Sequence, residues 1–170
     1  MLGEFNHAID DWIHELEHYD LTQLCAKPSP NSWSLGQVYM HLIDDTNYYL
    51  EQIKICTSIN DNEMEEASVT AKKMFLNNAF PDERIEGAPT NINMPQPLSK
   101  EQLTGSLENL KDLLENAEIL ISKTPFKGKT KHPGLNYFSA SEWFQFADMH
   151  FRHHLRQKKR IDEFLKAGRH

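Results

Sequence analysis

Residues 99–123, SKEQLTGSLENLKDLLENAEILISK, show the pattern that decides the fold of this chain. Their apolar side chains recur at alternating spacings of four and three residues, at Leu103, Leu107, Leu110, Leu114, Ala117 and Ile121. This spacing places them along one side of an α-helix, as in a coiled coil. Ser99 and Gln102 stand three residues apart at its start, as a capping box requires. The stretch therefore predicts an amphipathic helix over residues 99–123 that packs against other helices.

Three further stretches show the same helical period. The first, predicted over residues 4–22, has an apolar side made of Phe5, Ile9, Trp12, Leu16 and Tyr19. The second, over residues 34–59, begins with Ser34 and Gln37 at capping-box spacing. The last, over residues 140–167, begins with Ser139 and Glu142 at the same spacing. No strand-like alternation competes with these patterns, so we expect an all-α four-helix bundle that spans residues 1–170 as one domain.

The connections between the predicted helices differ in length. Residues 25–33 and 124–138 contain prolines and predict short to medium linkers. Residues 60–98 are the longest connection, in which apolar positions between Met64 and Phe75 predict a short amphipathic helix. An extended loop should follow it, because four prolines stand there: Pro81, Pro89, Pro95 and Pro97. The bundle should therefore have one long crossover, between its second and third helices.

The composition narrows the class of protein. The chain has 18 Lys and Arg against 25 Asp and Glu, a formal charge of -7 that disfavours binding to a phosphate backbone. Its two cysteines, Cys25 and Cys56, form no close-spaced pair, which favours a reducing compartment. We read no signal peptide at the N-terminus and no apolar run of the roughly 20 residues that cross a bilayer. We therefore expect a soluble cytoplasmic protein without nucleic-acid or membrane partners.

The last predicted helix has polar residues in the middle of its apolar side. That side consists, in order, of Trp143, Ala147, His150, His154, Gln157, Ile161 and Phe164. Burying unpaired imidazole and amide groups costs on the order of a few kcal/mol, so these groups need partners. Residues four apart on a helix have Cβ atoms roughly 5–6 Å apart, which lets two imidazoles bind one metal ion. His150 and His154 are therefore candidate metal ligands.

A third ligand is available on the second predicted helix. Its row of the same spacing contains Val38, His41, Asp45, Tyr48, Gln52, Ile55 and Ile59. Three neutral imidazoles with open positions are typical of catalytic zinc sites. Asp45, one turn from His41, is a candidate for orienting a ligand ring, and Tyr48, His153 and Gln157 are candidates for further side chains around the ligands. The alternative is that each histidine is an ordinary core residue bonded to a carbonyl group.

Other charged residues of the helices have simpler interpretations. His14 and His18 share the four-residue spacing, but they lie on a polar side of the first helix and we expect no site there. Five basic residues should form a solvated flank of the last helix, namely Arg152, Arg156, Lys158, Lys159 and Arg160. His132 could close a four-ligand structural site.

Several stretches are similar to one known family. Residues 32–42, SWSLGQVYMHL, with Tyr48-Tyr49-Leu50 after them, resemble the DinB-like (DinB/YfiT) superfamily. So do His132-Pro133-Gly134, Ser141-Glu142-Trp143 and residues 150–157, HFRHHLRQ. The resemblance implies an up-down-down-up four-helix bundle, often a homodimer. It also implies that His41, His150 and His154 bind nickel, zinc or iron.

The resemblance also implies a range of activities. Members include S-transferases that use bacillithiol, mycothiol or glutathione, and maleylpyruvate isomerases. Our leading hypothesis is a metal-dependent thiol S-transferase, in which the ion favours the thiolate that attacks an electrophile such as an epoxide or alkyl halide. Two alternatives remain open: a hydrolase that uses a metal-bound hydroxide, and a stress-associated metal-binding protein without turnover.

Overall fold

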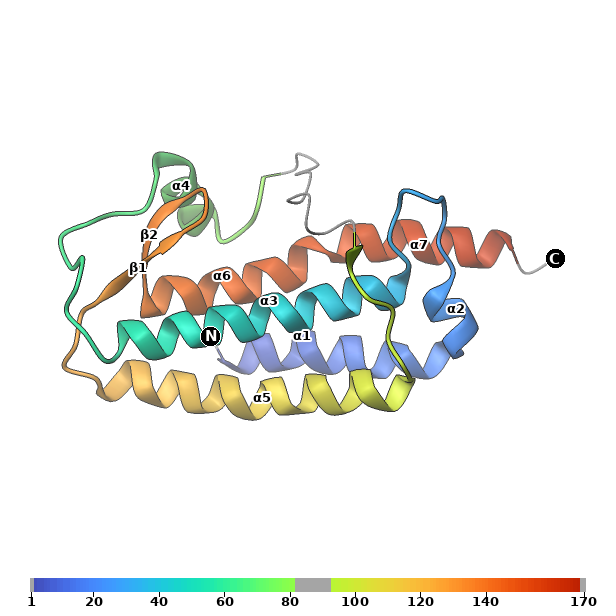
Figure 1. Cartoon of the computed structure of the whole chain (residues 1–170), viewed down its shortest axis with the longest axis horizontal. Coiled ribbons are helices and arrows are strands. Elements are labelled where there is room, and N and C mark those ends of the chain that lie inside the picture. Colours follow the sequence, from blue (N-terminus) through green and yellow to red (C-terminus); the bar gives the residue numbers. More distant parts are fainter. Residues whose placement is uncertain (1, 82–92, 169–170) are drawn as a thin grey trace.

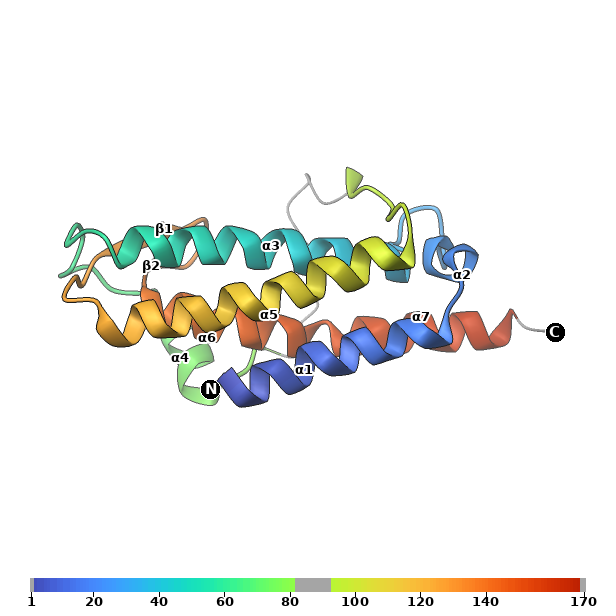
Figure 2. The same cartoon turned by 90° about the horizontal axis from the view of Figure 1, so that it is seen from below.

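Long helices lie side by side along the molecule, with a small hairpin and a short helix at one end (Figures 1 and 2). The computed structural model describes residues 2–81 and 93–168. The elements, in chain order, are α1 (Leu2–Glu15), the 3₁₀ helix η1 (Leu16–His18), α2 (Leu21–Cys25), α3 (Leu35–Cys56), α4 (Val69–Asn77), α5 (Lys100–Lys123), β1 (Lys129–His132), β2 (Asn136–Ser139), α6 (Ala140–His153) and α7 (Leu155–Ala167). The predicted, mainly helical architecture is confirmed.

The core lies between α1, α3, α5 and α6. The apolar row predicted on α5 is buried from Leu103 to Ala117, and only Ile121 at its end is half-buried. Ser99 caps this helix by accepting from the Gln102 N–H, but the Gln102 side chain accepts from Leu98 N–H, so the capping box is incomplete. Helix α3 ends and α5 begins at opposite ends of the bundle, as a long crossover requires (Figure 1). No helix in the described ranges is long and apolar enough to cross a membrane.

The connection between α3 and α5 follows the prediction in part. A short helix is present, but it begins after Ser68, whose side chain accepts from the Ala71 N–H and caps it. Met64, predicted at its start, is 91% exposed in the preceding turn. The part of the predicted extended loop around Pro89 lies outside the described residues.

The first predicted helix is not continuous over residues 4–22. It ends at Glu15, continues as a single 3₁₀ turn to His18, and becomes extended at Tyr19. A second helix, α2, then starts at Asp20, which forms a capping box with Gln23. That capping box provides hydrogen-bond partners for free N–H groups at the start of α2. It therefore stabilises a separate helix where the apolar period alone predicts one continuous helix.

The start of α3 is held by the segment that leads into α5. Ser34 and Gln37 form the predicted capping box. The Ser34 hydroxyl also donates to the Gln96 side chain (2.6 Å), and Gln37 Nε2 donates to the Met94 carbonyl (2.6 Å). Pro97 lies so close to Gly36 that a Cβ there would be 2.7 Å from the proline ring. These contacts fix the helix that bears His41.

We expect Gly36→Ala to destabilise the protein by about 1–3 kcal/mol, because the added methyl group meets the Pro97 ring and the Leu24 carbonyl oxygen. Urea unfolding followed by circular dichroism measures the change. Gly105→Ala in α5 is the matched control, since nothing lies within 4 Å of its Cβ position. In a helix interior that control should raise stability by about 0.5–1 kcal/mol. Equal effects of both substitutions would contradict the close approach at Gly36.

Residues 124–138, predicted as a linker, contain an antiparallel hairpin. Strand β1 pairs with β2 in the register Lys129↔Ser139 to His132↔Asn136, and Asn136 has a φ of 65°. The hairpin is anchored to α6, because the Trp143 indole N–H donates to the Thr130 hydroxyl (2.8 Å). Four-residue strands with mostly half-exposed side chains show too little alternation to be recognised from sequence.

The row predicted to face the core on the second helix is correct only near its start. Val38 and His41 are buried, but Tyr48 is 42% and Ile55 43% exposed, and Ile59 follows the helix end. The buried positions of its second half are instead Thr46, Tyr49, Leu50, Ile53 and Cys56. The predicted row lies at the margin of the buried side, because α3 packs on both α5 and α6 and its buried arc is centred between them.

Candidate metal centre

Three imidazoles from two helices converge on one point. His41 Nε2 lies 3.1 Å from His150 Nε2, which in turn lies 3.0 Å from His154 Nε2. One ring nitrogen from each of the three histidines lies within 4.8 Å of the others. His41 and His150 are buried, and His154 is half-buried. The structure thus brings together the three residues that the sequence predicts as metal ligands.

The helix that carries two of these histidines is interrupted at the site. The predicted helix over residues 140–167 consists of α6 and α7, which meet at His154 (Figure 1). The ladder remains nearly continuous, because the His154 N–H donates to the His150 carbonyl at 3.3 Å and its own carbonyl accepts from Lys158 N–H at 3.0 Å. Neither proline nor glycine stands there, so the sequence shows no sign of the interruption. Such irregular turns often occur at functional sites.

Gln157 determines which nitrogen of His154 is available. Its amide oxygen lies 2.8 Å from His154 Nδ1, so Nδ1 carries the proton and donates. The neutral ring then presents an unprotonated Nε2 to the cluster, which is the form that binds a metal ion. Gln157, a candidate from the sequence, therefore holds the His154 ring in an orientation suited to ligation.

All three imidazoles are held in the neutral form. Burial, with a smaller contribution from the neighbouring His154, lowers the pKa of His41 to about 3. Burial also lowers the pKa of His154 to about 4, against the opposing effect of the hydrogen bond with Gln157. The pKa of His150 is lowered well below its usual range by burial and by the other imidazoles. Because metal ions compete with protons for these nitrogens, the neutral donor set fits a divalent cation.

Asp45, a candidate for orienting a ligand ring, lies on the Nε2 side of the cluster. Its Oδ2 is 3.4 Å from His41 Nε2 and 3.8 Å from His150 Nε2, so it faces the converging nitrogens. Within the described residues, Nδ1 of both these histidines is buried without a hydrogen-bond partner. Asp45 therefore does not orient either ring through Nδ1. Burial raises the pKa of Asp45 to about 6, with Asp44 adding to the rise and a long bond from Tyr49 (3.5 Å) opposing it.

The comparisons with known proteins identify the family of the chain. The family model of the DinB superfamily matches residues 4–157, a range that includes all three histidines and Gln157. The chain belongs to the DinB superfamily. It is also 27% identical over 168 residues to the uncharacterized protein YuaE of Bacillus subtilis (strain 168), covering 96% of this chain and 98% of that protein. No solved structure matches the chain.

Aromatic side chains enclose the histidines of this DinB-superfamily protein. The rings of Trp33 and His41 are 4.9 Å apart, and those of Tyr49 and Phe80 are 5.8 and 5.9 Å from that of His150. None of these three aromatic residues was predicted at the site. Tyr49 could have been found, because it stands four residues after Asp45 on the same helix. Phe80 could not, since it comes from the connection whose pattern is hardest to interpret.

Three other candidates occupy different places. Tyr48 is exposed, and its ring contacts Tyr49 and Trp143. His153 is half-buried, with its ring 4.9 Å from that of Phe80, at the edge of the enclosure. His132 packs in the hairpin against Phe138, Trp143 and Phe146, and it does not join the group of converging nitrogens. The structure thus does not support a four-ligand site completed by His132.

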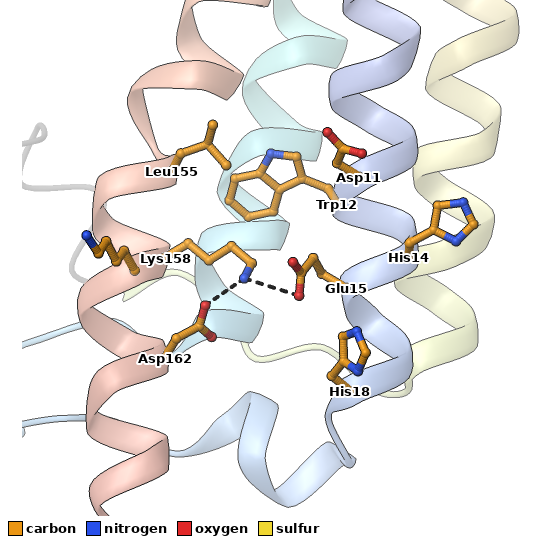
Figure 3. A pocket seen from close by; sticks show the side chains of 9 residues that line it. Asp11, Trp12, His14, Glu15, His18, Leu155, Lys158 and Asp162 are labelled. Carbon is orange, nitrogen blue, oxygen red and sulfur yellow. Dashed lines mark hydrogen bonds and ion pairs between the residues drawn. The ribbon is translucent and has the colours of Figure 1, made fainter.

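A hollow of about 360 Å³ lies between α1 and α7, and none of the three converging histidines lines it (Figure 3). His14 of α1 and His18 of η1 line it without converging, as expected for exposed polar positions. The predicted solvated flank is wrong for Lys158, which is 7% exposed. It reaches across to Glu15 of α1 (3.6 Å) and also pairs with Asp162 (2.7 Å), one turn along α7. Burial alone would lower its pKa, but hydrogen bonds with Asp162 and Tyr19 raise it overall. Arg152 is half-buried, and Arg156, Lys159 and Arg160 are exposed.

Proposed function

We propose that this DinB-superfamily protein binds a divalent metal ion through His41, His150 and His154 and activates a small thiol on it for transfer to an electrophile. The observation that supports the proposal is the convergence of three neutral imidazoles, two of whose Nε2–Nε2 separations are 3.0 and 3.1 Å. Protein groups occupy only part of a normal coordination sphere in such a site, so a substrate atom can bind. The homodimer implied by the family resemblance stays a prediction.

Two of the nitrogen–nitrogen separations would suit a six-coordinate ion. Two metal–nitrogen bonds of about 2.1 Å place their nitrogens about 3.0 Å apart at a right angle and about 3.4 Å apart at the tetrahedral angle. The two observed separations fit the right angle. Of nickel, iron and zinc, the first two adopt such geometry readily, whereas zinc in proteins is most often tetrahedral. Nickel or iron is therefore the proposed occupant.

The chemistry follows from charge. A divalent ion held by neutral ligands keeps its positive charge, which favours the thiolate over the thiol. Gln157 holds the His154 ring in place, so that the Nε2 lone pair would point at a bound ion. Trp33, Tyr49 and Phe80 keep the surroundings apolar, and electrostatic interactions are stronger in such surroundings than in water.

We expect protein loaded with Ni²⁺ or Fe²⁺ to conjugate low-molecular-weight thiols with an alkyl halide or epoxide. Elemental analysis of purified protein identifies the native metal, and thiol consumption is then compared among glutathione, bacillithiol and mycothiol. Chelation should abolish conjugation and metal addition should restore it. Addition of thiol to Co²⁺-loaded protein should also produce a thiolate-to-metal absorption band, because the sulfur binds the ion directly. A loaded protein that shows neither the band nor conjugation would contradict the thiol proposal and favour metal binding without turnover.

A further inference from the structure

The carboxylate of Asp45 lies where it would be stabilised by a positive charge between the three imidazoles. Its Oδ2 is 3.4 Å from His41 Nε2 and 3.8 Å from His150 Nε2. The same two nitrogens lie 3.1 Å from each other, and His150 Nε2 also lies 3.0 Å from His154 Nε2. A carboxylate oxygen therefore faces the side of the rings from which a metal ion would be bound, not the Nδ1 side.

Protons alone satisfy this arrangement poorly. The Gln157 oxygen assigns the His154 proton to Nδ1, so His154 presents only a lone pair to His150. A neutral imidazole has one N–H, and His150 Nε2 meets two other nitrogens and the Asp45 oxygen. Lone pairs that face one another at such distances repel, unless a cation lies between them. The geometry thus calls for one cation shared by all four groups.

Within residues 2–81 and 93–168, the carboxylate has no competing cation. Among the described residues, the only ion-pair partners of Asp45 are the two imidazoles. The only hydrogen bond described for its side chain comes from the Tyr49 hydroxyl and is long, at 3.5 Å. Asp45 stands four residues after His41 on α3, so both side chains lie on the same side of one helix turn. The carboxylate can therefore move toward an ion without breaking a strong contact.

We infer that Asp45 is a fourth ligand, which binds through one carboxylate oxygen the same ion that His41, His150 and His154 bind. The inference rests on the proposed metal site, to which it adds a charged oxygen donor. Three imidazoles and one carboxylate reduce the charge of the centre from +2 to +1. In a six-coordinate ion this set still leaves two positions for a thiolate and water, so it is compatible with catalysis.

The test compares Asp45→Ala and Asp45→Asn with Asp44→Ala, which removes an exposed carboxylate one residue away on the same helix. Each variant, with its helical fold checked by circular dichroism, is loaded with Co²⁺. Affinity is measured by chelator competition, and coordination by the visible absorption spectrum. We expect Asp45→Ala to bind Co²⁺ more than about 100-fold more weakly, because side chains that only contact a ligand cost about 10–100-fold. The spectrum of Asp45→Ala should change as water replaces the carboxylate oxygen. The Co²⁺ affinity of Asp45→Asn should fall between those of Asp45→Ala and the unmodified protein. Asp44→Ala should match the unmodified protein in affinity and spectrum.

Other results would overturn the inference in distinguishable ways. An unchanged spectrum in Asp45→Ala, whatever the affinity, would show that the carboxylate is not bonded to the ion. Failure of the unmodified protein to bind Co²⁺ would contradict both the proposed metal site and Asp45 as its fourth ligand. Strong Co²⁺ binding that depends on Asp45, but without any thiol conjugation, would support the fourth ligand and contradict only the proposed thiol chemistry.

Discussion

Replacement of His154 by alanine should abolish tight metal binding, with a loss of affinity greater than about 100-fold. The variant removes one of three converging Nε2 atoms and leaves Gln157 without its ring partner. The two remaining imidazoles and the Asp45 carboxylate bind a divalent ion less tightly, because water takes the vacated position. The measurement is competition with a chelator of known affinity for Ni²⁺ or Zn²⁺, together with the metal content of protein purified without added metal.

His14→Ala and His18→Ala are the matched controls. These histidines have the same four-residue spacing as His150 and His154, but His14 in α1 and His18 in η1 are both exposed. Both controls should retain the affinity of the unmodified protein. If His154→Ala binds as tightly as these controls, the three histidines are ordinary core residues and the proposed function loses its chemical basis.

The metal-free protein should lose stability steeply in mild acid. Burial lowers the pKa of His41 to about 3, and of His154 and His132 to about 4, whereas unfolded histidines titrate near 6.5. Between about pH 6.5 and pH 4 the unfolded chain therefore binds more protons than the folded protein. The free energy of unfolding must fall as the pH falls through this range. One imidazole such as His41 accounts for a loss of about 3 kcal/mol between about pH 7 and pH 4.5.

Urea unfolding of metal-free protein at several pH values measures this slope. His132→Phe should reduce it, because a phenyl ring replaces a titrating one among Phe138, Trp143 and Phe146. A double variant, His14→Ala with His18→Ala, should keep the same pH dependence of the free energy of unfolding, because both residues are exposed. Saturating metal should also raise stability at neutral pH, since the ion binds only the folded arrangement. A free energy of unfolding that is constant from about pH 7 to pH 4.5 would contradict the burial of neutral imidazoles.

Much of the helical content and the three converging histidines could be predicted from the sequence. The row from Leu103 to Ala117 is buried as its spacing predicts, and the capping boxes at Ser34 and Ser139 are present. His150 and His154 stood out because polar residues interrupted an apolar row. These signals are local, because period and capping depend on residues a few positions apart.

The failures involve contacts between distant segments. The hairpin is anchored by the hydrogen bond between Thr130 and Trp143. Lys158 is buried because it contacts Glu15 at the end of α1 and Tyr19 just after η1. The spacing of residues along one helix predicts neither of these contacts. The row through Tyr48 and Ile55 was wrong because two neighbouring helices, not one, determine which side of α3 is buried.

Spacing along the chain is enough to predict amphipathic helices with three histidines on or beside their apolar sides. The 3.1 Å between the Nε2 atoms of His41 and His150, and the position of Asp45 facing them, follow instead from how the helices pack. Hydrophobic periodicity reports the side of a helix that is buried, because burial is roughly proportional to apolar area and has no direction. Metal ligation depends on direction and on distances of a few tenths of an ångström, which arise when separate helices pack in one register.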